Sequence, residues 1–209
     1  MPCHAHPNVR QWIAAVSCVM VFNGVPSWAA DAPATRSAAE RLNAPEAQTK
    51  ALMDRIGSWD VTASFQPTPD AQPKIAKGIV AERRMVGRTL TEEMHPAAGA
   101  PGESFQRLAW FQYSAVEGRW QYVSLDTRFP VGIMPAYSFD GGDANKVTLA
   151  FEPIAFVGMG AEVEGKMLRS NLVITHDGRD HDIVQQFAIT SDGTGRRWKL
   201  VEYDYRRRP

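Results

Sequence analysis

Two histidines stand close enough in the sequence to share a metal ion. His176 and His181 flank residues 177–180 (Asp-Gly-Arg-Asp), and a hairpin looped at this tetrapeptide would place the two rings opposite each other. A two-residue turn at Asp-Gly would instead pair His176 with Arg179. A polar hairpin tip is the commoner use of such a sequence, so we predict no metal site.

Two adjacent carboxylates, Glu92 and Glu93, lie in a run that is typical of a β-strand. Neighbours on a strand point to opposite faces, so these two cannot act together as the acid and base of a hydrolase. His95 follows them at the strand end, and the chain lacks a nucleophile elbow, a phosphate loop and a dinucleotide fingerprint. We therefore predict that the protein is not an enzyme and needs no cofactor. An enzyme that uses barrel carboxylates and His95 is the alternative.

Aromatic side chains crowd the middle of the chain, and an arginine lies among them. Side chains of a strand alternate between two faces, so residues of one parity share a wall. The residues predicted to line a ligand site on such a wall are Arg107, Phe111, Tyr113, Trp120, Tyr122 and Ser124. An arginine in an apolar interior needs an anionic partner. The carboxylate of an acidic amphiphile would supply that partner to Arg107.

Short β-strands are the elements that would position these side chains. Ten runs with strand-like patterning are separated by turns rich in Gly, Pro and Asp. They are residues 59–66, 74–86, 88–94, 104–113, 120–127, 131–139, 146–151, 162–175, 181–190 and 196–206. A flat sheet of ten strands would leave two exposed edges. We predict an all-β fold, a closed or nearly closed up-and-down antiparallel barrel of about ten strands, with a two-sheet sandwich as the alternative.

A short helix is predicted over residues 45–56, before the first strand. Asn43 stands as its N-cap, and a proline and an acidic residue follow in the first turn. Gly57 stands where a C-terminal cap belongs. We therefore divide the chain into a leader (1–29), a linker (30–44) and one helix-plus-barrel domain (45–209).

The leader has the pattern of a secretory signal peptide. It contains no acidic residue and one formal positive charge, Arg10, before an apolar run (WIAAVSCVMVF) and a small-residue end at Ala29 and Ala30. The apolar run is shorter than the about 20 residues that span a bilayer. Cleavage after Ala29 or Ala30 would leave a mature chain without cysteine and without a transmembrane segment, in the periplasm or the medium. A lipid anchor at Cys18 and a buried N-terminal helix are the alternatives.

The tripeptide Gly57-Ser58-Trp59, at the start of the first strand, resembles the G-x-W signature that opens lipocalins. In that family the tryptophan packs beneath an arginine of the last strand and closes the barrel floor. Arg206 stands in a suitable place for that arginine. The resemblance thus implies a structural floor made by Trp59 and Arg206, with a contact of roughly 0.5 to 2 kcal/mol.

A second resemblance covers about residues 50–207. The segments that carry it are Trp59-Asp60-Val61, RMVGRTL at 84–90, WQYVSLD at 120–126 and WKLVEY at 198–203. On these segments the chain resembles the bacterial family called domain of unknown function 1579, which is thought to be calycin-like. The family has large rings at the positions of Trp120 and Ser124, which implies that the face carrying these two residues is the interior one. The small Ser124 would then enlarge the cavity near Tyr122.

The charge balance bears on the choice of partner. Lys and Arg together number 23, as do Asp and Glu, so no strong field attracts nucleic acid. We therefore expect an exported barrel protein that binds a small, largely apolar or acidic amphiphilic molecule. An envelope interaction module with a filled barrel and no ligand is the alternative.

Overall fold

The computed structural model describes residues 36–43, 47–155, 157–161, 163–191 and 193–209. The predicted signal peptide, its cleavage after Ala29 or Ala30 and the alternative anchor at Cys18 lie outside these residues. In the described ranges, no helix combines the length and the apolar character needed to cross a membrane.

Two short helices precede the barrel, α1 (Ala38–Asn43) and α2 (Ala47–Met53). In α1, which lies within the predicted linker, Ser37 and Glu40 exchange two hydrogen bonds between side chain and backbone, a capping box. The helix predicted over residues 45–56 is confirmed as α2 but ends earlier. The amides of Arg55 and Ile56 donate to carbonyls three residues back, which tightens the chain into a turn.

The rest of the described chain forms one antiparallel sheet. Its strands are β1 (Gly57–Phe65), β2 (Lys74–Val86), β3 (Thr89–Pro96), β4 (Arg107–Ser114), β5 (Arg119–Asp126), β6 (Met134–Tyr137), β7 (Lys146–Phe151), β8 (Ile154–Ala155), β9 (Met167–His176), β10 (His181–Thr190) and β11 (Arg197–Arg207).

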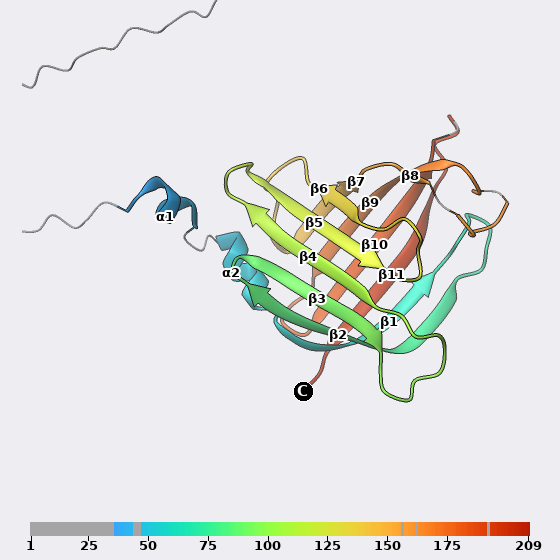
Figure 1. The fold of residues 1–209 in the computed structure, drawn as a ribbon, viewed down its shortest axis with the longest axis horizontal. Helices are drawn as coiled ribbons and strands as arrows, with labels where there is room; N and C mark the ends of the chain where they lie inside the picture. The colour runs from blue at the N-terminus through green and yellow to red at the C-terminus, as the bar shows by residue number, and fades with distance from the viewer. Residues whose placement is uncertain (1–35, 44–46, 156, 162, 192) are drawn as a thin grey trace, which may run out of the picture. The chain divides into compact units, whose positions relative to one another are not determined.

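The strands close on themselves into a barrel. They follow one another in chain order from β1 to β7, and β9, β10 and β11 complete the circuit (Figure 1). β11 pairs with β1, with Tyr205 opposite Val61, so these ten strands leave no open edge. The two-residue β8 only extends the pairing of β9. The predicted ten-strand antiparallel barrel is therefore confirmed, and the sandwich alternative is wrong.

The barrel has a helix end, where α2 lies, and a loop end opposite to it. α2 contacts β3 and β4, and its Leu52 belongs to the main hydrophobic core (Figure 1). At the loop end the rings of Phe65 and Phe129 are in contact, with centroids 6.1 Å apart. Between the two ends, every second side chain of β5 is buried, from Trp120 to Asp126. The period-two rule thus decides which side chains fill the interior.

Candidate ligand-binding site

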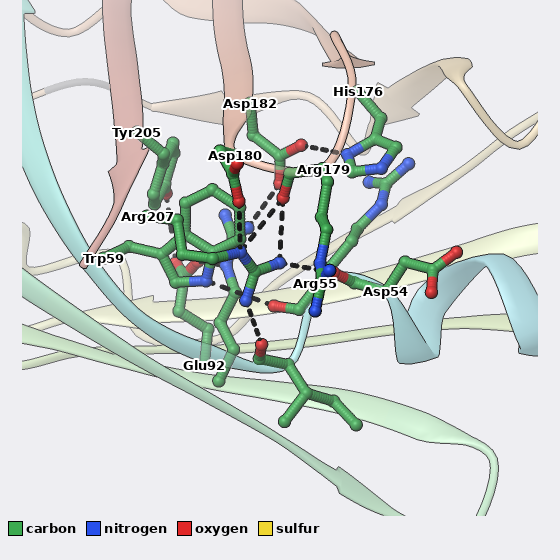
Figure 2. A network of polar contacts seen from close by, with 12 residues as sticks. Asp54, Arg55, Trp59, Glu92, His176, Arg179, Asp180, Asp182, Tyr205 and Arg207 are labelled. Carbon is green, nitrogen blue, oxygen red and sulfur yellow. Dashed lines mark hydrogen bonds and ion pairs between the residues drawn. The ribbon is translucent and has the colours of Figure 1, made fainter. Parts of the chain in front are cut away.

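Trp59 forms the floor of the barrel at the helix end. Its side chain is 0% exposed, and its indole Nε1 donates to the carbonyl of Arg55 over 3.2 Å. The guanidinium of Arg207 lies 4.3 Å from the ring centre, and that of Arg83 lies 4.8 Å from it. Arg207 also donates to the carbonyls of Asp54 and Ile56, so it fastens the turn after α2 to the floor (Figure 2).

The floor arginine is Arg207, so the prediction of Arg206 is wrong. Arg206 pairs with Asp60 in the ladder, its Nε donates to Asp204, and its side chain is 63% exposed. Arg207 rather than Arg206 faces Trp59 because the register between β10 and β11 shifts. Gln186 pairs with Val201 and Phe187 with Lys199, which leaves Leu200 without a partner in this ladder. Such an extra residue reverses the parity of everything after it.

All six residues of the predicted ligand wall lie on the interior side, but three of them are packed core and three border a cavity. Phe111 stacks on Trp120 with centroids 4.8 Å apart, and Tyr113 meets the same indole edge-on at 5.3 Å. The Nε1 of Trp120 donates to the carbonyl of Gly141 over 2.7 Å. These three rings are packed core near the helix end. Arg107, Tyr122 and Ser124 border a cavity nearer the loop end.

The anionic partner of Arg107 comes from the chain itself. Its Nη1 lies 2.6 Å from Oε1 of Glu92, and its Nη2 donates to the hydroxyl of Tyr122. The prediction that a ligand carboxylate would pair with Arg107 is therefore wrong. Of the two adjacent carboxylates, Glu92 faces the interior, whereas Glu93 accepts a hydrogen bond from Gln106 in an exposed pair.

Glu92 belongs to a larger group, the buried charge cluster, which comprises Arg55, Arg83, Glu92, Arg107 and Asp182. Arg83 joins both carboxylates, because its Nε lies 2.8 Å from Glu92 and its Nη1 donates to Asp182. All of its members except Arg55 come from different strands, and Arg55 follows α2. Figure 2 shows Arg55, Glu92 and Asp182. We did not predict Arg83 or Asp182, because polar residues of a strand ordinarily face solvent, or Arg55, which stood at the end of the predicted helix.

The arginines hold both carboxylates in the charged form. Burial alone would raise the pKa of Glu92, but Arg83 and Arg107 outweigh it and hold that pKa below its usual value. The pKa of Asp182 is likewise lowered, because Arg83 and Arg55 outweigh its burial. A general acid needs the opposite, a raised pKa. The cluster thus has the electrostatics of a structural ion network.

Two neutral tyrosines, Tyr122 and Tyr205, lie next to the buried charge cluster. Burial raises the pKa of Tyr205 well above its usual value, and the negative charge of Glu92 raises it further. Burial also raises the pKa of Tyr122. The Tyr205 hydroxyl therefore stays protonated and donates to Oε1 of Glu92 over 3.2 Å.

The interior holds two cavities. The loop-end cavity has a volume of about 40 Å³, and the inner cavity, nearer the helix end, about 30 Å³. Arg107 and Tyr122 border both and form the partition between them. A water molecule occupies about 10 to 15 Å³ by this measure, so each cavity has room for about two to four waters. Most of the barrel is filled by its own side chains.

Apolar side chains form most of the wall of the loop-end cavity. The principal ones are Phe65, Phe129, Met134, Phe151, Leu172 and Val201. The cavity reaches the surface at Pro130 and Val157, which are both exposed. Ser124 and the Arg107–Tyr122 pair supply polar atoms at its inner side, and Gln186 and Asp126, which is paired with Arg128, also line it.

The two hairpin histidines do not face each other. Asp182 stands opposite His176 in the ladder, and its Oδ1 lies 2.5 Å from the ring Nδ1. His181 points to the outer side, where Asp177 and Asp204 contact its ring. Neither of the two predicted pairings therefore forms. In the described part of the chain, no three His, Cys, Asp or Glu side chains are grouped to hold a metal ion.

His95 is separated from the interior carboxylate by strand parity. Glu92 and Met94 share the inner face of β3, and His95 lies on the other face, with its Nδ1 2.9 Å from the carbonyl of Pro96. The alternative enzyme site, which would combine His95 with a barrel carboxylate, is therefore not assembled.

The fold and the site define a class, an antiparallel ten-stranded barrel whose interior is charged toward the helix end and apolar toward the loop end. Compared with models of known protein families the chain matches none, and a search of the curated proteins finds no match either. The resemblance to the domain of unknown function 1579 stays a prediction.

Proposed function

We propose that this protein binds a small, neutral, largely apolar molecule in the loop-end cavity of its barrel. The observation that carries the proposal is the cavity itself, which is lined mainly by apolar side chains and reaches the surface at Pro130 and Val157. Apolar clefts with a few convergent polar groups are the usual form of small-molecule sites.

The charge state of the cavity favours a neutral ligand over an acidic one. Glu92 already neutralises Arg107, and Nη2 of that arginine donates to the hydroxyl of Tyr122. An entering carboxylate would have to compete with Glu92 for a buried guanidinium and would lose its own hydration. A hydroxyl or carbonyl oxygen can instead bond to Ser124 without disturbing the ion pairs.

Ligand size follows from the volume. About 40 Å³ admits only a few non-hydrogen atoms, so a longer molecule would leave its remainder at the mouth, beside Pro130 and Val157. Short alcohols and the terminal segments of longer apolar chains are molecules of this kind. We further propose that the protein meets its ligand outside the cytoplasm, because the leader has the order of a signal peptide.

A second candidate function, an interaction module without a ligand, is favoured by one observation. The two cavities are small, and large side chains such as Trp59 and Trp120 are fully buried in the interior. Under this alternative the barrel would act only as a rigid support for its outer surface.

Calorimetric titration with linear alcohols of four to eight carbons distinguishes these functions. We expect saturable binding to the wild type, and at least tenfold weaker binding of the carboxylates of equal length. Ser124→Phe, which fills the cavity, should abolish binding of the alcohols. Val123→Phe is the matched control, because Val123 is its neighbour on β5 and lies on the opposite face.

Two results would contradict the proposal. Absence of alcohol binding to the wild type would favour the interaction module. Equal binding by the wild type and Ser124→Phe would place the site elsewhere.

A further inference from the structure

The charges around the inner cavity do not balance. The buried charge cluster contains three guanidinium groups, of Arg55, Arg83 and Arg107, but only two carboxylates, Glu92 and Asp182. The neighbouring tyrosines keep their protons and so add no negative charge. His176, in contact with Asp182, adds none in either protonation state. The cluster therefore carries at least one positive charge in excess.

Arg55 is the arginine whose hydrogen bonding is incomplete. Its Nη2 donates to the carbonyl of Ala144 over 2.6 Å, but its Nε is buried and has no partner among the described residues. The residue is 2% exposed and borders the inner cavity. A buried charged donor without an acceptor is costly, so such a group ordinarily faces a bound acceptor.

The charge of Arg55 persists at neutral pH. Burial lowers the pKa of Arg55 to about 10, with Asp182 opposing this change and Arg83 adding to it. At pH 7 the guanidinium is therefore still protonated, and it lies beside a second buried arginine, Arg83. An excess cation in such surroundings attracts a negative charge strongly.

We infer that the inner cavity is a binding site for one small monovalent anion, which accepts a hydrogen bond from Nε of Arg55 and neutralises the buried charge cluster. The volume of about 30 Å³ limits the occupant to one to three non-hydrogen atoms, the size of a halide or formate. Larger oxyanions such as phosphate and sulfate exceed this space.

This anion site is independent of the proposed ligand site. The neutral ligand lies on the loop-end side of the Arg107–Tyr122 partition, and the anion lies on the helix-end side. Ser124 borders only the loop-end cavity, so Ser124→Phe should leave anion binding unchanged. Failure of one proposal therefore does not carry over to the other.

Thermal unfolding in different salts tests the inference. At pH 7 and constant ionic strength, gluconate is replaced stepwise by bromide or by formate. We expect the wild-type Tm to rise with the anion concentration and then to follow the logarithmic law of a ligand bound only by the folded state. Arg55→Met should lose this response. Arg197→Met is the matched control and should keep it, because Arg197 is exposed and stacks on Phe187.

Crystals of the wild type grown with bromide provide a test that does not depend on how the variants fold. Anomalous scattering should place a bromide within hydrogen-bond distance of Nε of Arg55. A response to formate with none to bromide would assign the site to carboxylates, and a response to both would assign it to small anions in general. No anion-specific gain in Tm, with no anomalous peak in the inner cavity, would overturn the inference.

Discussion

The two halves of the barrel interior are lined by the same strands but are built from different chemistry. Toward the helix end, arginines, carboxylates and tyrosines bond to one another around Trp59 (Figure 2). Toward the loop end, apolar side chains surround a cavity. Strand parity selects the residues that face inward. Their position along the strand, toward the helix end or the loop end, decides whether they join the ion pairs or line the cavity. The charged half fixes the structure, and the apolar half contains the cavity that we propose as the ligand site.

Truncation of the floor should produce the largest loss of stability. Trp59→Ala removes a fully buried indole and its contacts with Arg83 and Arg207. We expect the free energy of unfolding to fall by about 5 kcal/mol, the upper end for aromatic truncation in a core. Chemical denaturation measures this change. Trp110→Ala is the control, because Trp110 is partly exposed on the outer side, and an equal loss there would contradict the role of the floor.

Neutralising the interior carboxylate should have the next largest effect. Glu92→Gln leaves Arg83 and Arg107 without their shared anion, and breaking a buried pair in this way costs roughly 3 to 5 kcal/mol. Glu93→Gln, one residue away on the outer face, should change the free energy of unfolding by less than about 0.5 kcal/mol. Similar losses in the two variants would refute the division of the strand into a charged inner and a solvated outer face.

Acid should destabilise the charged half. Because the folded-state pKa of Glu92 lies below the ordinary value of 4.5, its contribution to stability is complete above that pH. It is lost as the pH falls through the lower, folded-state pKa. The free energy of unfolding, measured from pH 6 down to pH 2, should therefore fall more steeply for the wild type and Glu93→Gln than for Glu92→Gln. Parallel curves for all three proteins would show that Glu92 is not held in its charged form.

The smallest effect should distinguish the two arginines at the end of β11. Arg207→Met loses the stacking on Trp59, which we expect to cost about 1 kcal/mol. Arg206→Met removes an exposed side chain and should cost less than about 0.5 kcal/mol. Denaturation of both variants under the same conditions measures the difference, and the reverse ranking would contradict the register of β11.

Period-two patterning was sufficient to predict the ten strands of the barrel and to put Tyr122 and Ser124 on one face. The choice of that face as the interior came from the family resemblance, and the structure has both residues there. The lipocalin resemblance pointed to Arg206 as the floor arginine, and the structure has Arg207 there. Leu200 is an extra residue in the ladder with β10, and it turns residue 207 rather than residue 206 toward Trp59.

Long-range ion pairs could not be predicted from the sequence. Arg83 and Asp182 are 99 residues apart and meet only because β2 and β10 are both part of one closed barrel. Arg55 lies in the turn after α2, and its direction depends on how that helix packs. A charged residue in a strand is ordinarily solvated, so each of these side chains looked like part of the surface.

Native mass spectrometry of the protein purified gently from the cells that make it would show whether the loop-end cavity has a natural occupant. We predict a 1:1 complex with a neutral molecule of low mass, present in the wild type and in Val123→Phe and absent from Ser124→Phe. The bare protein mass in all three preparations, together with no binding in the alcohol titrations, would contradict ligand binding. The barrel would then act only as a structural support.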